Sequence, residues 1–145
     1  MAKQDYSNHR RFYFLHHFIF YPATFALVIA SIYFADKHPE QKTEWYFIAI
    51  AIAVAAWLSF MVRQHYALTL QNRIVRLEMR LRYYQLCGKR FDEIERKLTF
   101  EQIAALRFAS DAELPALVER TLNENLQPDA IKKQVTNWQP DYMRV

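Results

Sequence analysis

The sequence of 145 residues has one glycine and one cysteine. Loops that cradle phosphate need glycine where backbone amides approach the phosphate closely, so Gly88 alone makes such a loop implausible. Sheet-rich folds use glycine in their turns, and the same scarcity argues against them. Because Cys87 is the single thiol, an internal disulfide and a thiolate zinc site are both excluded. The composition favours a helical protein without these sites.

Charged residues are absent from two apolar stretches of the chain. The ranges 18–35 and 45–62 each hold 18 residues, which extend about 27 Å as α-helix and match a slightly compressed bilayer core. The first contains nine Phe, Ile, Leu or Val residues, which favour insertion by roughly 3 to 5 kcal/mol. The sequence therefore predicts two transmembrane helices.

The basic residues beside these stretches predict their orientation. The range 36–44 holds two lysines against three acids, whereas the range 1–17 holds three basic residues against one acid. Five arginines against one glutamate follow in the range 63–82. The positive-inside rule then places both termini in the cytoplasm and the loop outside. So short a loop makes the two spans antiparallel neighbours.

The predicted organisation is that of an all-α membrane protein with three parts. A cytoplasmic or interfacial segment, 1–17, precedes a transmembrane hairpin, 18–62, whose spans are 18–35 and 45–62. A cytoplasmic helical domain, 63–145, follows and begins with a long helix that continues the second span.

That long helix is a stem over about 63–88 with two apolar stripes. One stripe has the 4-3-4-3 spacing of a heptad seam, and its members are Leu70, Ile74, Leu77, Leu81 and Tyr84. The second stripe, roughly opposite, consists of Leu68, Val75, Met79 and Leu86. Two heptads are short for a free-standing coiled coil, so we expect the tail's own helices to cover the stem on both sides.

Short helices are predicted over 100–109, 111–123 and 128–138. Thr99 with Gln102 and Ser110 with Glu113 have the spacing of capping boxes, and Pro128 suits the first turn of the last helix. Together they form a small bundle of short helices on the stem. The closing segment Trp138-Gln139-Pro140-Asp141-Tyr142, with its two aromatic residues, is expected to dock back on this bundle.

Four segments resemble one family of small two-span bacterial membrane proteins, found notably in Bacteroidetes and catalogued as a domain of unknown function. They are His16-His17-Phe18-Ile19-Phe20-Tyr21-Pro22, 77–90, 100–117 and Asn137-Trp138-Gln139-Pro140-Asp141. The resemblance implies a location in the bacterial cytoplasmic (inner) membrane. It implies no activity, ligand or catalytic residue.

Histidines are the candidate cofactor ligands. In a hairpin, His16 and His17 lie at the same depth as His65, so the three side chains could converge near the cytoplasmic interface. Imidazoles there could ligate a haem or a metal, or hydrogen-bond a quinone. Interfacial histidines are equally compatible with headgroup contact, and no carboxylate stands nearby in the sequence to orient a ring. No cofactor is predicted as the first choice.

A basic cluster flanks the spans and is expected to contact anionic headgroups or a partner protein. Its members are Arg10, Arg11, Arg63, Arg73, Arg76 and Arg80. Only the arginines nearest the membrane can interact strongly with lipid. Because the range 98–145 holds seven acids, we expect the distal arginines to pair with acidic residues of the bundle or of a partner. Asp92 and Glu93 are expected in solvated surface. The sequence lacks the alternation of basic and aromatic residues that nucleic-acid-binding modules have, so we expect no nucleic-acid binding.

Small residues give the second span a face that permits close helix packing. Ala51, Ala55 and Ser59 share this face at four-residue spacing. The face could receive the first span or another subunit, including a second copy.

No catalytic signature is present, so the sequence favours a non-catalytic role. The first hypothesis is an accessory, scaffold or assembly subunit of a bacterial cytoplasmic-membrane complex, or a homo-oligomer, with the tail and the small-residue face as contact surfaces. The alternative is a redox or cofactor-binding hairpin that uses His16 or His17 with His65. A membrane-bound enzyme ranks last.

Overall fold

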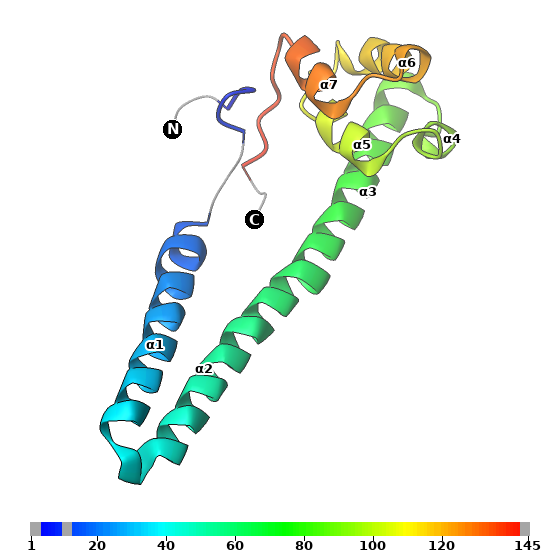
Figure 1. Cartoon of the computed structure of the whole chain (residues 1–145). Coiled ribbons are helices and arrows are strands. Elements are labelled where there is room, and N and C mark those ends of the chain that lie inside the picture. Colours follow the sequence, from blue (N-terminus) through cyan, green and yellow to red (C-terminus); the bar gives the residue numbers. More distant parts are fainter. Residues whose placement is uncertain (1–3, 10–12, 143–145) are drawn as a thin grey trace. The chain divides into compact units, whose positions relative to one another are not determined.

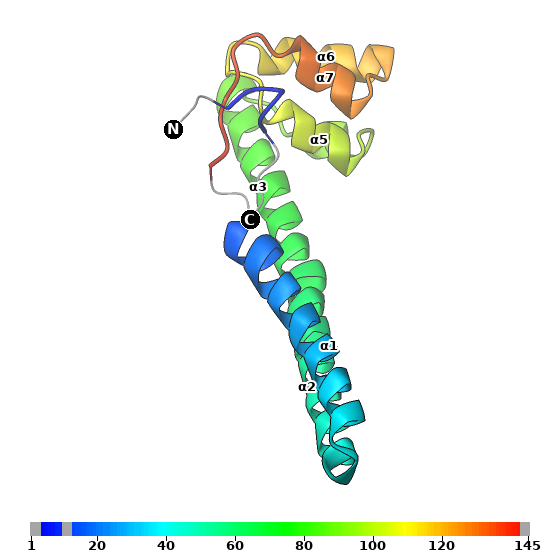
Figure 2. The same ribbon diagram turned by 60° about the vertical axis from the view of Figure 1, so that its left-hand side comes forward.

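The computed structural model describes residues 4–9 and 13–142, and every regular element in these ranges is a helix (Figures 1 and 2). The order along the chain is η1 (Leu15–Phe20), α1 (Tyr21–Lys37), η2 (Pro39–Gln41), α2 (Lys42–Met61), η3 (Val62–Ala67), α3 (Leu68–Cys87), α4 (Asp92–Glu95), α5 (Phe100–Leu106), α6 (Leu114–Glu124) and α7 (Pro128–Gln134). The predicted all-α class is confirmed.

The chain forms two compact units. Residues 13–69 make the first unit, called here the apolar pair. Residues 4–9 and 70–142 make the second, called here the bundle. The first unit is built from two long helices and the second from the end of a long helix and four short ones.

The apolar pair contains two helical runs that are long and apolar enough to cross a membrane. The first run extends over Leu15–Lys37 and the second over Pro39–Cys87, beyond the pair. α1 packs along α2, and the two helices run antiparallel, side by side in both views (Figures 1 and 2). At the turn between them, the rings of Phe34 and Trp45 stack with centroids 5.0 Å apart.

Each long helix contains a stretch of wider, π-type helix at the end that lies away from this turn. These stretches are η1, before α1, and η3, after α2. η1 precedes Pro22, and in it the backbone N–H of Tyr21 bonds to the carbonyl of His16, five residues back. Proline has no N–H and its ring crowds the carbonyl four residues earlier, so a change of helical pitch at this point relieves the conflict. The first helix therefore starts at Leu15 and continues through Pro22.

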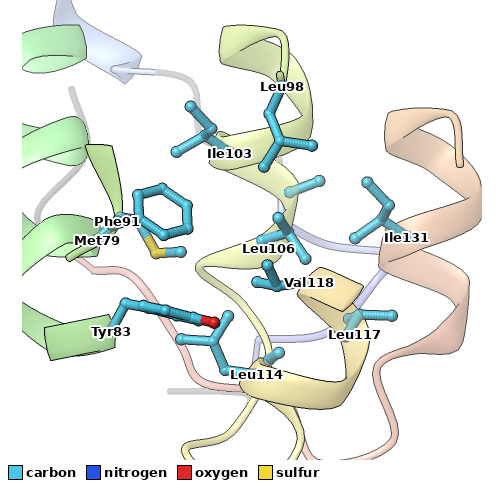
Figure 3. Packing of buried hydrophobic residues seen from close by; sticks show 12 residues of the cluster. Met79, Tyr83, Phe91, Leu98, Ile103, Leu106, Leu114, Leu117, Val118 and Ile131 are labelled. Carbon is cyan, nitrogen blue, oxygen red and sulfur yellow. The ribbon is translucent and has the colours of Figure 1, made fainter. Parts of the chain in front are cut away.

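The bundle has one hydrophobic core, to which α3, α5, α6 and α7 all contribute. Figure 3 shows Met79 and Tyr83 of α3 on one side of this core and Ile131 of α7 on the other. The remaining large members are Phe91, Leu98, Ile103, Leu106, Leu114, Leu117 and Val118. α5 begins with the predicted capping box, in which Thr99 and Gln102 each bond to the other's backbone N–H. That prediction is confirmed.

Each short helix is shorter than predicted or shifted, because buried turns interrupt the apolar periodicity. α5 ends at Leu106 rather than 109, and the chain turns there with Phe108 and Ala109 in the interior. α6 begins at Leu114 rather than 111 and ends at Glu124. α7 ends at Gln134 rather than 138, since Val135 is already extended (ψ 115°).

The segment after α7 docks on the bundle through Trp138 as predicted, whereas Tyr142 is 48% exposed. The Trp138 indole is 7% exposed and stacks on Phe108 with centroids 4.5 Å apart. The N–H of Gln139 bonds to the carbonyl of Phe108 at 2.7 Å.

Residues 4–9 also belong to the bundle, which the sequence did not predict. The amide oxygen of Gln4 accepts the backbone N–H of Asp141 at 2.6 Å. The imidazole of His9 lies 5.9 Å from the Phe108 ring and 6.0 Å from that of Trp138. Residues 4–9 and the segment after α7 therefore meet on the same surface of the bundle.

Glu113 joins α6 to the segment that follows α7. Its carboxylate accepts the hydroxyl and backbone N–H of Ser110, the same two groups of Thr136, and the N–H of Asn137. Burial acts to raise its pKa, but the hydrogen bonds from Thr136 and Ser110 outweigh burial and lower the pKa to about 2.

Replacing this carboxylate should destabilise the bundle in a pH-dependent way. A group whose pKa is depressed in the folded state stabilises it above the unfolded pKa, near 4.5 for Glu113, and that stability is lost as the pH falls toward 2. Glu113→Gln should lower the free energy of unfolding by about 1 to 3 kcal/mol at neutral pH. The variant should also lose less stability than the native chain between pH 4.5 and 2, which thermal unfolding in detergent would measure. Parallel pH profiles for the two proteins would contradict this role.

Candidate functional site

Helix α3 presents two apolar faces, and the bundle covers only one of them. Val75, Met79 and Tyr83 are 5%, 1% and 5% exposed, and Met79 and Tyr83 belong to the hydrophobic core of the bundle. Their spacing of four residues places them on one side of the helix. Val75 and Met79 belong to the predicted second stripe, whereas Leu68 is half-buried and Leu86 is exposed.

The heptad seam lies on the other face and is exposed along its whole length. Leu70 is 56% exposed, Ile74 53%, Leu77 59%, Leu81 59% and Tyr84 57%. The expectation that the tail's own helices cover both stripes is therefore wrong. The reason is geometric, because the short helices leave α3 at Gly88 and return along one side only.

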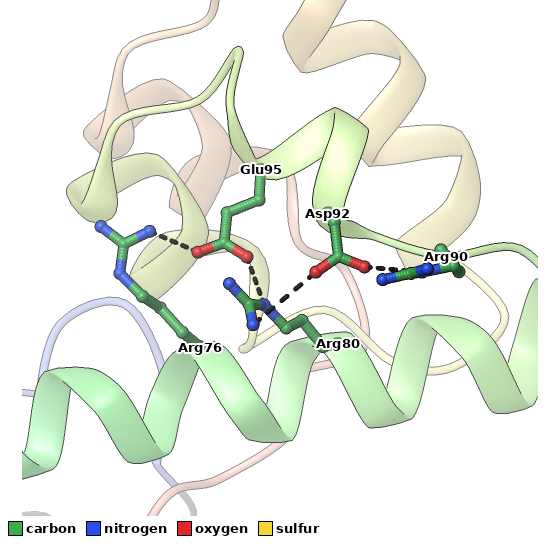
Figure 4. A network of polar contacts seen from close by, with 5 residues as sticks. All are labelled: Arg76, Arg80, Arg90, Asp92 and Glu95. Carbon is green, nitrogen blue, oxygen red and sulfur yellow. Dashed lines mark hydrogen bonds and ion pairs between the residues drawn. The ribbon is translucent and has the colours of Figure 1, made fainter.

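Salt bridges hold the covered face of α3 against the α4 turn (Figure 4). Arg76 Nη1 donates to Glu95 Oε1 at 2.6 Å, and Arg80 Nε donates to Glu95 Oε2 at 2.5 Å. Arg80 also lies 3.6 Å from Asp92, which in turn accepts Arg90 at 3.0 Å. Burial acts to raise the pKa of Glu95, but the hydrogen bonds from Arg80 and Arg76 outweigh burial and lower the pKa.

These ion pairs show where two members of the predicted basic cluster, Arg76 and Arg80, lie. Arg76 and Arg80 pair with acids of the bundle, and these acids are Glu95 and Asp92, which precede the acid-rich range 98–145. Asp92 is half-buried in the network, not in solvated surface as predicted, whereas Glu93 is exposed as predicted. Nothing in residue spacing distinguishes Glu95 from its neighbours, since its role depends on how the chain turns after Gly88.

Arg82, which the sequence did not single out, fixes α3 to the end of α5. Its guanidinium donates to the carboxylate of Asp111 at 2.7 Å and to the carbonyls of Arg107 and Ala109 at 3.0 and 2.6 Å. A planar guanidinium can satisfy several helix-end carbonyls at once. Arg107 in turn pairs with Asp141 at 3.0 Å.

The other arginines of the predicted cluster take different positions. Arg73 is exposed beside the seam, and Arg63 is half-buried in η3. Arg10 and Arg11 lie outside the residues that the structure describes. Contact of these side chains with lipid headgroups or with a partner stays a prediction.

The histidines are only partly brought together. The rings of His16 and His17 lie in η1 with centroids 5.4 Å apart, and Nε2 of His16 is buried without a hydrogen-bond partner among the described residues. His65 is exposed in η3, where no hydrogen bond or ring contact joins it to either ring within 4–9 and 13–142. Binding of haem, metal or quinone stays a prediction, which the visible spectrum and metal content of the purified protein would test.

The small-residue stripe of the second helix is not the face that receives α1. Ala51 and Ala55 are exposed, and Ser59 is half-buried. α1 instead packs near Ala49, which is 7% exposed, with its own Ser31 and Ala35 buried. Each residue turns an α-helix by about 100°, so Ala49 and Ala51, two positions apart, lie on roughly opposite faces.

Comparison with known proteins concerns the whole chain. A family model described as a family of unknown function, DUF6526, matches residues 1–145. The chain belongs to DUF6526. This confirms the resemblance to a domain family of unknown function that the sequence segments indicated. No curated protein and no solved structure matches this DUF6526 chain.

Loss of the Glu95 carboxylate should separate α3 from the α4 turn. Glu95→Gln removes the acidic partner of Arg76 and leaves Arg80 with Asp92 alone, at a site where the Glu95 side chain is 8% exposed. Because the arginines are 35% and 43% exposed, solvent screening limits the expected loss of unfolding free energy to about 2 kcal/mol.

The matched control is Glu93→Gln, which changes an exposed acid of the same turn and should alter stability by less than about 0.5 kcal/mol. Thermal unfolding followed by circular dichroism compares the stabilities of the two variants. Equal stabilities would show that the salt bridges contribute nothing measurable.

Proposed function

We propose that this DUF6526 protein is a membrane-anchored, non-catalytic scaffold or accessory subunit of a bacterial cytoplasmic-membrane complex. Its two apolar helices form a transmembrane hairpin, both chain ends lie in the cytoplasm, and the bundle is the cytoplasmic domain. The interaction surface is the exposed heptad seam of α3. The observation that carries this proposal is that five large apolar side chains stay uncovered on a helix whose opposite face is buried at Val75, Met79 and Tyr83.

Insertion in a membrane is supported by the exposure of the apolar pair. Only 11% of the most apolar stretch of the first helical run and 6% of that of the second are buried within the structure. Large side chains such as Phe25, Phe47 and Trp57 are 66% to 69% exposed. A core helix of a soluble protein would bury such residues, whereas lipid solvates them without cost.

Two crossings, rather than one, are supported by contacts within the bundle. Residues 4–9 precede the first apolar run, and the partners of Gln4 and His9 follow the second run. Segments in contact with each other lie on the same side of a membrane, so the chain between them crosses an even number of times. The excess of basic residues in 1–17 and 63–82 assigns that side to the cytoplasm.

A scaffold role is supported by the distribution of polar groups as well. The ion pairs of the bundle join its own elements and hold the covered face of α3. Among the described residues, no three His, Cys, Asp or Glu side chains form a group that could hold a metal ion. An exposed apolar stripe with polar neighbours is the feature typical of a protein contact surface.

Topology can be tested by cysteine labelling, since Cys87 is the only natural thiol. In a Cys87→Ala background, Glu40→Cys places a thiol in the turn between the spans and Glu101→Cys places one on the exposed start of α5. A membrane-impermeant maleimide should label the residue-40 variant in intact spheroplasts and the residue-101 variant only after lysis.

Two results would contradict the membrane proposal. One is labelling of both positions before lysis, which would place the bundle outside. The other is recovery of the chain in the aqueous supernatant after high-speed centrifugation without detergent.

A further inference from the structure

The exposed seam has the residue pattern of a two-stranded coiled coil. With Ile74 and Leu81 at the a positions and Leu70, Leu77 and Tyr84 at the d positions, the seam fits two consecutive heptads. In parallel coiled coils, a β-branched residue at a with leucine at d favours two strands, as with Ile74 between Leu70 and Leu77. The bundle does not obstruct this face, because Val75, Met79 and Tyr83 occupy the b, f and c positions on the far side of α3.

Charged residues on both edges of the seam indicate the relative orientation of the two strands. Arg73 at a g position and Glu78 at an e position are exposed, and neither has a hydrogen bond or ion pair with any described residue. They are five residues apart, which is the spacing at which a g residue meets the e residue of the other strand in a parallel coiled coil. By symmetry, a dimer would contain two such Arg–Glu pairs.

An antiparallel pair would not gain these contacts. In that arrangement g positions face g positions, so Arg73 and Arg80 of one copy would approach the same arginines of the other. Arg80 is engaged with Glu95 within its own chain, which leaves Arg73 as the free cation of the seam's edge among the described residues. The charges therefore favour two identical strands in parallel.

We propose that the occupant of the heptad seam is a second copy of this chain, in a parallel two-stranded coiled coil over residues 70–84. This inference rests on the proposed function, because the membrane supplies two conditions that a seam of two heptads needs. Copies inserted with one topology share their chain direction at the membrane surface. Confinement to the bilayer also raises the effective concentration of one seam near another.

Disulfide trapping in native membranes tests the contact. In a Cys87→Ala background, Leu77→Cys puts a thiol at a central d position, where the two strands of a parallel dimer approach closely. Thr69→Cys is the matched control, since it is exposed on the same helix but at a c position. With copper phenanthroline as oxidant, the residue-77 variant should give a covalent dimer at least fivefold above that of the residue-69 variant.

Charge reversal tests the orientation in the same assay. Added to Leu77→Cys, either Arg73→Glu or Glu78→Arg should reduce the dimer yield severalfold, because each places like charges opposite each other. The two reversals combined should restore the yield, which general damage to α3 would not do. Circular dichroism of each variant confirms that the helix content is unchanged.

The outcomes separate this proposal from the one it rests on. Equal yields for positions 77 and 69, or no rescue by the double reversal, would overturn the parallel homodimer. A chain that stays in the membrane fraction without a dimer band would leave the anchored scaffold standing and exclude a second copy from the seam. A chain absent from the membrane fraction would overturn both.

Discussion

The arrangement of the tail depends on one constraint, which is that α3 can be covered by its own bundle on a single side. Met79 and Tyr83 anchor the hydrophobic core, and Glu95 between Arg76 and Arg80 fixes the α4 turn beside them. A bundle of four short helices does not reach around a helix of 20 residues. The consequence is a second apolar face that the chain cannot bury by itself.

This constraint links the fold to the proposed role. A soluble monomer rarely leaves a continuous apolar stripe of this length uncovered, because each exposed side chain forfeits its burial free energy and favours aggregation. In a membrane-anchored chain, the same stripe encounters few partners, and its own orientation relative to the membrane is fixed. The polar residues at its edges then decide which partners fit, through the pairing of opposite charges.

The contact between residues 4–9 and the end of the chain has a second structural consequence. It closes the bundle with a segment that precedes the apolar pair, so the bundle is complete only after both long helices have been made. His9 inserts beside Phe108 and Trp138, and Gln4 bonds to the backbone of Asp141. Completion of the bundle therefore requires segments from both sides of the apolar pair along the chain.

The sequence alone determined the helical class, the two long apolar helices, the capping box at Thr99 and the docking of Trp138. These features follow from local composition and spacing, which act over a few residues. Only the tertiary structure decided which stripe of α3 is buried, that Arg76 and Arg80 choose Glu95, and that Ala49 rather than Ala51 lies near α1. Two stripes of similar apolarity have similar burial free energy, so the choice depends on where the turn after Gly88 directs the chain. That direction is set by long-range packing and is not encoded in the periodicity of the helix.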